Sequence, residues 1–436
     1  MSLLKLNSTK WREHVYASLQ RYWPNAREVV MELPIPSRQL PDIEVIPPKL
    51  TPINLPPWAG ELGVDGEIIV PFWAYQAGRA KWQDVDWIAV AFWYMENLAE
   101  RAFESKHGPI HSYSFRLKGW DPKFWNNAWV NRIALFLRRW SAHIKKKDEF
   151  SLHGPLPSYE IKLTHDVDAV SKTIPIRAKQ TTFQFYNAIR KFFRGKPGQS
   201  LGHFRKGFQF LYRSGNYWCF ETIRSMERIY NLSSTFNFYA GNSCGVRSIR
   251  EWLMDPCYDI QNPRLVKLLS QLKMDGCSIG LHPSFDAWKD FTRISREKEN
   301  LEKATGFEVK TCRQHWLRFS FEDTWKNQQA CGIKEDTTLG FNDRSGFRNG
   351  CALFRKPWDP IKGMPYKLDS IPMILMDSHI FDYHDLTESD RKREILKWVR
   401  EIKDVRGQCS VIWHQRVFSK DYSWAMEYGD LLRFIS

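Results

Sequence analysis

Apolar and polar positions follow a repeating order from residue 157 to the end of the chain. Short runs rich in apolar and β-branched residues, typical of buried strands, alternate with longer stretches whose apolar positions recur with helical spacing. This alternation predicts a parallel α/β fold, and the number of strands suits a barrel. The predicted strands cover 159–165, 234–240, 277–282, 309–315, 370–377 and 409–414, and the predicted helices between them include 262–276, 295–306 and 320–332.

The part of the chain before residue 150 has a different pattern. Eight of the residues from Pro34 to Pro57 are prolines, so this stretch cannot hold a helix and is expected to run extended over the surface. Helical spacing of apolar positions predicts one helix in 84–105 and another in 122–147, beginning near Asp84 and Pro122.

A change of composition near residues 148–157 predicts a domain boundary. Three consecutive lysines end there, and a Gly-Pro pair follows. We therefore predict a Pro- and Trp-rich accessory region at 1–150 and a barrel at 155–436, with a basic insertion at about 169–220.

The insertion concentrates the net charge of +15. Residues 169–220 contain no Asp or Glu, and aromatic residues are interleaved with ten cations. Such a segment, expected to be helical, suits an anionic membrane surface or a polyanionic glycan, although simple solvation explains it equally well. Nucleic acid is the weakest expectation, because no known nucleic-acid-binding motif accompanies the charge. The ten cations are Lys172, Arg177, Lys179, Arg190, Lys191, Arg194, Lys196, Arg205, Lys206 and Arg213.

Composition narrows the class of protein further. Aromatic residues make up 15% of the chain, which suits core packing and also platforms for sugar rings. The eight cysteines include no C-x-x-C pair, which argues against a zinc ribbon and gives no disulfide framework. We find no apolar run of transmembrane length and no signal-peptide pattern, so we expect a cytoplasmic protein with at most peripheral membrane contact.

Residues that can bind a metal or move a proton stand at the ends of four predicted strands. The first run ends in Asp166-Val167-Asp168, and three later runs end in His282, His315 and His414. In a barrel, chemistry lies at the carboxyl ends of the strands. Because side chains two apart on a strand point the same way, Asp166 and Asp168 share a direction. The pair could grip a cation or divide metal binding from proton transfer, or it could be a solvated turn.

Five motifs in this order resemble those of the polysaccharide deacetylases with the NodB-homology fold. Members of that family have a distorted (β/α) barrel and hold one divalent metal, most often zinc, through one Asp and two His. The resemblance covers about residues 157–420 and implies the same fold and cofactor here. The motifs are LTHDVD (163–168), IGLHPSFDAW (279–288), CRQHWLR (312–318), KEDTTLGFND (334–343) and VIWHQ (411–415).

The resemblance implies a role for each matching residue. Asp166 would be the general base and His414 the general acid. Asp168 and His282 would bind the metal. Arg313 would hold Asp166 in its ionised form, since a neighbouring cation lowers the pKa of a carboxylate.

Substrate contacts are implied less specifically. Trp316 would wall the substrate pocket, and Asp336 belongs to the fourth motif. The polar loop 343–359 could line the substrate cleft, with Arg348 as a candidate contact, or it could be purely structural.

The chain departs from the family pattern at one metal ligand. The family's second motif usually has a further His four residues after the first, where this chain has Asp286. His315 stands where the family commonly has proline, also at a predicted strand end. The third protein ligand is therefore His315 or Asp286, unless the site has two ligands or no metal.

The activity implied is metal-dependent hydrolysis of N-acetyl groups on the amino sugars of a polysaccharide or glycan precursor of the cell envelope. A metal-activated water would attack the amide, Asp166 would accept its proton, and His414 would protonate the departing amine. Two alternatives stay open. One is a catalytically inactive barrel that binds a glycan or partner, and the other is an amidohydrolase acting on another C–N bond.

Overall fold

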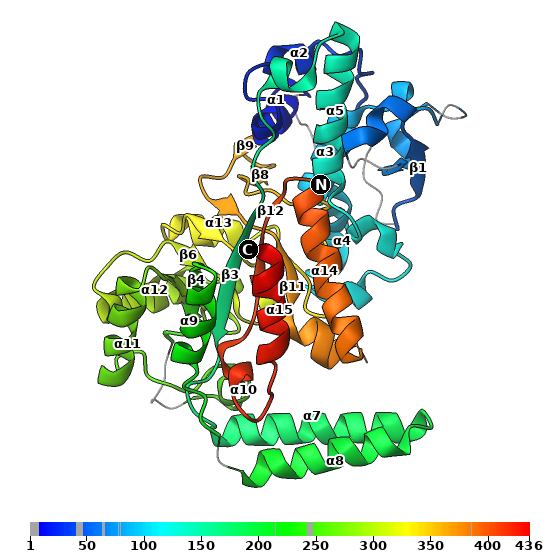
Figure 1. Ribbon diagram of the computed structural model, residues 1–436. Coiled ribbons are helices and arrows are strands. Elements are labelled where there is room, and N and C mark those ends of the chain that lie inside the picture. The colour runs from blue at the N-terminus through cyan, green and yellow to red at the C-terminus, as the bar shows by residue number, and fades with distance from the viewer. Residues whose placement is uncertain are drawn as a thin grey trace. The chain divides into compact units, whose positions relative to one another are not determined.

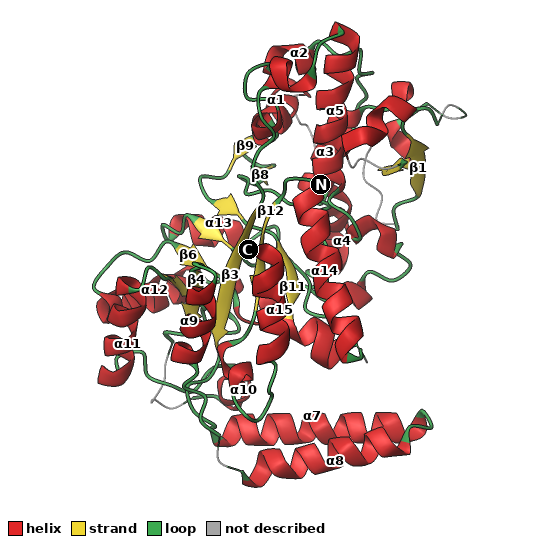
Figure 2. Cartoon of the chain, viewed as in Figure 1, coloured by secondary structure: helices red, strands yellow, loops and turns green. Residues whose placement is uncertain are grey.

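The computed structural model describes residues 8–40, 47–62, 66–76, 78, 80–213, 215–241, 247–384 and 386–436. The chain forms two compact units. One consists mainly of Met1–Lys162 and Lys310–Val411, and the other of Leu163–Val309 and Ile412–Phe434. The boundary predicted near residue 150 stays a prediction. Figures 1 and 2 show the elements of both units.

The first unit begins with helices and a β-hairpin and ends with short strands. Its helices are α1 (Ser8–Ser18), α2 (Arg27–Met31), α3 (Trp87–Met95), α4 (Leu98–His107), α5 (Trp129–Lys145), α6 (Glu149–His153), α13 (Thr324–Ala330) and α14 (Glu388–Asp404). Its strands are β1 (Leu50–Asn54), β2 (Glu67–Pro71), β6 (Thr311–Cys312), β7 (Glu335–Asp336), β8 (Trp358–Asp359), β9 (Met364–Pro365), β10 (Asp369–Ser370) and β11 (Met373–Met376). The strand β12 (Gln408–Ile412) lies in this unit except for its last residue.

The second unit alternates strands and helices. Its strands are β3 (Glu160–Val167), of which the first three residues belong to the other unit, β4 (Ser234–Phe238) and β5 (Ser278–Leu281). Its helices are α7 (Ile174–Phe193), α8 (Pro197–Tyr212), α9 (Phe220–Ile229), α10 (Ile249–Met254), α11 (Pro263–Met274), α12 (Phe291–Thr305) and α15 (Ala425–Ile435).

Helices form in both predicted N-terminal ranges, but the range 84–105 holds two helices, α3 and α4, and the predicted starts are wrong. The first helix begins at Trp87 because the side chain of Asp86, not Asp84, accepts the N–H of Ala89 at 3.0 Å. Pro122 begins only a 3-10 turn. In the described part of the proline-rich stretch the chain holds no α-helix, as predicted.

All six predicted strands are present, and the parallel arrangement is confirmed. The pairs β3–β4, β4–β5, β6–β7 and β7–β10 are parallel. The last five residues of β3 and all of β11 are buried, as expected for strands covered on both faces. The run 370–377 forms two strands, β10 and β11, and β7 was not predicted because it has only two residues.

The strand order supports the predicted barrel. Eight strands form one sheet in the order β10-β7-β6-β5-β4-β3-β12-β11. Its two end strands are joined through Ile371 and Pro372 alone. The Ile371 N–H donates to the Asp336 carbonyl at 2.8 Å, and the Ser410 N–H donates to the Pro372 carbonyl at 2.8 Å. This connection is bonded to neighbours on both sides, so the strand order closes as a distorted (β/α) barrel requires.

In the described ranges, no helix combines the length and the apolar character needed to cross a bilayer.

Candidate metal-binding and catalytic site

Asp166 and Asp168 come from the carboxyl end of β3. Asp166 is the seventh residue of the strand, is 3% exposed, and pairs in register with Asn237 on β4. The Asn237 amide donates to Asp166 Oδ1 at 2.8 Å. Asp168 follows the end of the strand, and its side chain is 20% exposed. One carboxylate is therefore held inside the sheet, while the other reaches beyond it.

The Asp168 carboxylate lies between two of the predicted histidines. His282 Nε2 is 3.4 Å from Asp168 Oδ1, and His414 Nε2 is 3.7 Å from Asp168 Oδ2. Arg416 Nη1 also contacts Oδ2. His282 follows β5 directly and His414 follows β12 by two residues, so the second unit by itself brings residues of three distant motifs together.

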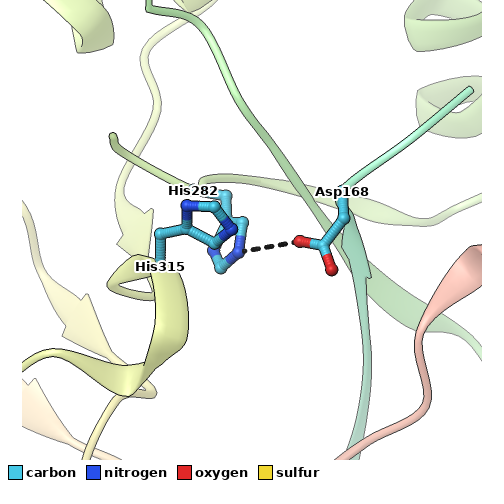
Figure 3. Close-up of side chains that lie close together, drawn as sticks. All are labelled: Asp168, His282 and His315. Carbon is cyan, nitrogen blue, oxygen red and sulfur yellow. Dashed lines mark ion pairs between the residues drawn. The ribbon is translucent and has the colours of Figure 1, made fainter. Parts of the chain in front are cut away.

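His315 completes a set of three metal-competent side chains. Figure 3 shows Asp168, His282 and His315, each of which offers one ligand atom, and these atoms all lie within 4.8 Å of one another. One carboxylate oxygen and two imidazole nitrogens form a donor set that suits zinc and related divalent metals. The residues therefore fit the metal that the resemblance implies.

The turn that carries His315 has an unusual backbone. Trp316 and Leu317 both have left-handed φ angles, 57° and 47°, which cost free energy in residues other than glycine. Two side chains hold this turn. Asn342 Nδ2 donates to the Trp316 carbonyl at 2.6 Å, and Ser112 Oγ donates to the Leu317 carbonyl at 2.5 Å. The direction of the His315 side chain therefore depends on these two hydrogen bonds.

Asn342→Ala should weaken metal binding although Asn342 is not a ligand. Without its hydrogen bond the strained turn relaxes, and we expect the affinity for zinc to fall by about tenfold, as for other residues that orient a ligand. Zinc titration against a chromophoric chelator measures the change. Asn349→Ala is the matched control, because its amide bonds the Met95 carbonyl and not this turn. Equal affinities of wild type and Asn342→Ala would contradict the prediction.

Asp286, the alternative ligand, lies elsewhere in the second unit. Its two carboxylate oxygens accept hydrogen bonds from Arg250 at 2.8 and 3.0 Å. Its side chain is 35% exposed, and it is not part of the three-residue group. Its role as a metal ligand stays an alternative prediction, and His315 has the better geometry.

Two further predicted residues lie beside His315 in the sequence. Arg313 is completely buried directly after β6, and Trp316 is half-buried. The predicted support of Asp166 by Arg313, and the predicted pocket wall at Trp316, remain predictions.

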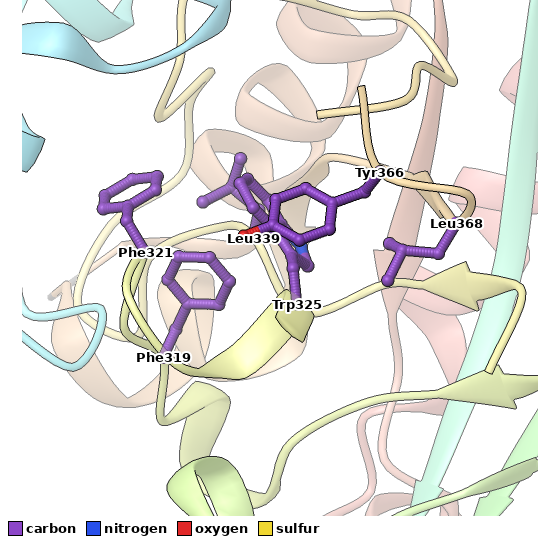
Figure 4. Packing of buried hydrophobic residues seen from close by; sticks show 6 residues of the cluster. All are labelled: Phe319, Phe321, Trp325, Leu339, Tyr366 and Leu368. Atoms are coloured by element: carbon purple, nitrogen blue, oxygen red, sulfur yellow. The ribbon is translucent and has the colours of Figure 1, made fainter. Parts of the chain in front are cut away.

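Arg348 and Asp336, the predicted substrate contacts, are buried by protein groups. Arg348 is 1% exposed, donates to Glu100 and Ser112, and lies over the ring of Phe319. Asp336 is completely buried and accepts from Trp325 Nε1 at 3.0 Å. Burial raises the pKa of Asp336 in spite of this and other hydrogen bonds. Figure 4 shows the surrounding apolar cluster of Phe319, Phe321, Trp325, Leu339, Tyr366 and Leu368.

Two residues that contact the aspartates were not predicted from the sequence. Asn237 is a buried amide between two phenylalanines of β4, which was a detectable signal for a polar partner. Arg416 lies two residues after His414 and had no such signal, because cations are common in loops.

Glu297 supports the loop that follows His282. The N–H and hydroxyl of Ser284 donate to its carboxylate at 2.7 and 2.5 Å, and its side chain is almost completely buried. Burial raises the pKa of Glu297 to about 7, because desolvation of the ionised form outweighs these hydrogen bonds.

Glu297→Gln should remove part of the pH dependence of stability. A raised pKa favours the folded state at low pH, so this contribution is lost as pH rises from the ordinary value of 4.5 to about 7. The loss amounts to about 3 kcal/mol of unfolding free energy. Urea unfolding of both proteins at several pH values measures it. Parallel pH curves for wild type and variant would show that Glu297 does not titrate in this way.

The chain is similar to several solved structures. Neither a protein-family model nor a curated protein matches the chain. Among solved structures, a protein from Mycobacterium smegmatis assigned as a polysaccharide deacetylase is 15% identical, with a TM-score of 0.36 over 63% of this chain and 82% of that chain. The polysaccharide deacetylase Bc1974 from Bacillus cereus is 7% identical, with a TM-score of 0.30 over 64% and 87%.

A CE4 family pseudoenzyme from Bacillus anthracis is also similar, at 9% identity and a TM-score of 0.30 over 62% of this chain and 59% of that chain. The solved structures named here are polysaccharide deacetylases or a CE4 family pseudoenzyme.

Proposed function

We propose that the protein is a metal-dependent hydrolase that removes N-acetyl groups from amino sugars of a polysaccharide or glycan precursor. One observation carries the proposal. Within a single compact unit, the Asp168 carboxylate lies 3.4 Å from His282 and 3.7 Å from His414, and Asp166 stands two residues earlier, near the end of β3. Carboxylates and imidazoles in this arrangement can divide metal binding from proton transfer.

Asp168, His282 and His315 would hold one divalent metal, zinc by their donor chemistry. A bound metal of this kind lowers the pKa of a coordinated water and polarises an amide carbonyl. Three protein ligands leave room for water or substrate, as catalytic zinc sites require.

Asp166 is the proposed general base. Its Oδ1 accepts the hydrogen bond from Asn237, which orients the carboxylate. Asp166 is not part of the three-residue group, so its carboxylate can accept the proton that water loses on attacking the amide.

His414 is the proposed general acid. Its ring approaches Asp168 Oδ2, whereas the ring of His282 approaches Oδ1. An amide nitrogen leaves as a neutral amine only when it is protonated, and the His414 ring can supply that proton. The products are then acetate and a free amino sugar.

Release of acetate from N-acetylated sugars tests this function. Purified protein is incubated with N-acetylglucosamine oligomers, with partly acetylated glycans and, as controls, with formamides and cyclic amides. We expect acetate and a new primary amine from the sugars only, and loss of both with a chelator. Turnover of the controls alone would favour an amidohydrolase of another C–N bond, and no turnover of any compound would oppose an enzyme.

A second candidate function is glycan or partner binding without catalysis. The contact of Arg416 with Asp168 favours it, because a guanidinium at the ligand carboxylate opposes a divalent cation there. Peripheral contact with an anionic membrane is compatible with either function.

Arg416→Gln should therefore tighten metal binding. Removal of the positive charge beside Asp168 is expected to raise the affinity for zinc by about tenfold. Equilibrium competition with a chelating dye measures this. Arg433→Gln is a suitable control, since this exposed arginine pairs with Asp430 instead. An unchanged or lower affinity in Arg416→Gln would mean that the arginine does not compete with the metal.

A further inference from the structure

Helices α7 and α8 form an antiparallel hairpin in the second unit. Figure 1 shows them side by side. Thr181 Oγ1 donates to the Gly207 carbonyl at 3.3 Å, and Ser200 Oγ donates to the Ala188 carbonyl at 2.8 Å. Small residues permit this close approach: a Cβ atom at Gly207 would lie 2.5 Å from the ring of Phe185. The two helices therefore cover one side of each other.

Both helices present their exposed apolar residues to the same face. Each residue of an α-helix is rotated by about 100° from the one before it. Because the helices are antiparallel, the residue that follows a contact residue lies on the same side of the hairpin in either helix. Ile189 follows the contact residue Ala188, Leu201 follows Ser200, and Phe208 follows Gly207, and they are 51%, 71% and 53% exposed.

We call this side the apolar face of the hairpin. It carries large side chains on both helices and at the turn between them. Tyr186, Ile189, Phe192, Leu201, Phe208 and Tyr212 lie on it, and Phe193 extends it at the turn with 82% exposure.

The base of the hairpin packs against the rest of the unit. Phe210 is buried, and its ring lies 5.3 Å from that of Tyr422. The ammonium of Lys172 pairs with Asp421 at 2.8 Å. Asn187, one step before Ala188, is buried, whereas Ile189, one step after it, is exposed. The hairpin is thus anchored at its base, and its apolar face stays exposed.

Cations are exposed along the hairpin and at its turn, and residues 169–220 contain no acidic side chain. Arg194 and Lys196 are exposed at the turn, and Arg205, Lys206 and Arg213 are exposed along and beyond α8. A second copy of the chain would place these cations against like charges, which disfavours self-association. Nucleic acid would pair with the cations but not with Ile189 or Leu201. An anionic bilayer satisfies both features, since it offers negative head groups above an apolar interior.

We propose that the apolar face of the α7–α8 hairpin docks on the surface of an anionic lipid bilayer. The helices lie in the plane of the interface, where the aromatic and aliphatic side chains enter the acyl region and the cations meet lipid phosphates. The inference is independent of the proposed hydrolysis.

Sedimentation with lipid vesicles tests the proposal on the full chain. The vesicles consist of phosphatidylcholine alone or of an equimolar mixture with phosphatidylglycerol. We expect binding to the mixed vesicles that weakens with added salt. The triple variant Ile189→Ser, Phe193→Ser, Leu201→Ser and the triple variant Arg194→Gln, Lys196→Gln, Arg205→Gln should each bind about a hundredfold more weakly.

Two exposed apolar residues outside the hairpin provide the control. Ile361 and Met274 are 81% and 79% exposed, and the variant Ile361→Ser, Met274→Ser should bind mixed vesicles like wild type. Equal binding to both kinds of vesicle, or equal losses in this control, would overturn the proposal. The proposal would also be overturned if the protein bound no vesicle and formed a dimer that dissociates in the serine variant, or if it bound RNA instead.

Discussion

Asp168→Asn is expected to abolish both metal binding and hydrolysis. The amide keeps the shape of the side chain but removes the charge that the proposed ligand set of one carboxylate and two imidazoles supplies. Loss of the metal removes several kcal/mol of stabilisation from the transition state, so acetate release should fall by about a thousandfold or more. Metal content by mass spectrometry and acetate release by a coupled assay give two separate readouts.

Asp286→Asn is the matched control for this substitution. It changes the same residue type within the same unit, but the Asp286 carboxylate pairs with Arg250 near the surface. We expect metal content and activity close to those of wild type. A variant Asp286→Asn that loses the metal, beside an Asp168→Asn that keeps it, would reverse the assignment of ligands.

Glu227→Gln should destabilise the protein more than any other substitution considered. Glu227 is completely buried on α9 and accepts hydrogen bonds from His165 Nε2 at 3.0 Å, Arg224 Nη1 at 3.0 Å and Tyr428 Oη at 2.7 Å. Removal of the negative charge takes the nearer counter-charge from the buried Arg224, which keeps only the longer ion pair with Asp275 at 3.6 Å. Breaking a buried ion pair in this way costs about 3–5 kcal/mol.

Urea unfolding compares this variant with Glu221→Gln on the same helix. Glu221 pairs with Arg228 at 2.9 Å, but its side chain is 74% exposed, so its loss should cost less than about 1 kcal/mol. Similar losses of unfolding free energy in the two variants would mean that the buried contacts of Glu227 contribute little to stability.

The contacts of Glu227 with His165, Arg224 and Tyr428 should weaken in acid. Burial alone would raise the pKa of Glu227, but hydrogen bonds and the charge of His165 outweigh it, so the pKa lies below its ordinary value. The stabilisation is therefore complete above the ordinary pKa of 4.5 and is lost as pH falls through the lower folded value. Glu227→Gln should lack this acid-dependent part of the unfolding curve.

His165 is close to the candidate site in the sequence but has a structural role. It precedes the two aspartates, yet it is completely buried, with Nδ1 donating to the Trp413 carbonyl at 2.6 Å. It fastens β3 to the segment that carries His414 and does not join the three-residue group. Alternation along a strand explains this difference, because His165 points to the face opposite Asp166.

The sequence by itself determined the fold class and the positions of the candidate residues along the chain. Strand periodicity and helical spacing are local properties, so the strands, the parallel order and the polar residues at strand ends could all be predicted from them. The same holds for the helical character of the basic insertion, confirmed by α7 and α8.

Only the tertiary structure decided which side chains meet. Asp286 and His315 were both candidate ligands in the sequence, with His315 favoured. The chain after β5 places Asp286 beside Arg250, whereas the strained turn after β6 carries His315. Arg348 looked like a substrate contact in a polar loop and is instead paired with Glu100 inside the protein. Such pairings join residues far apart in the chain, and local periodicity contains no information about distance between strands.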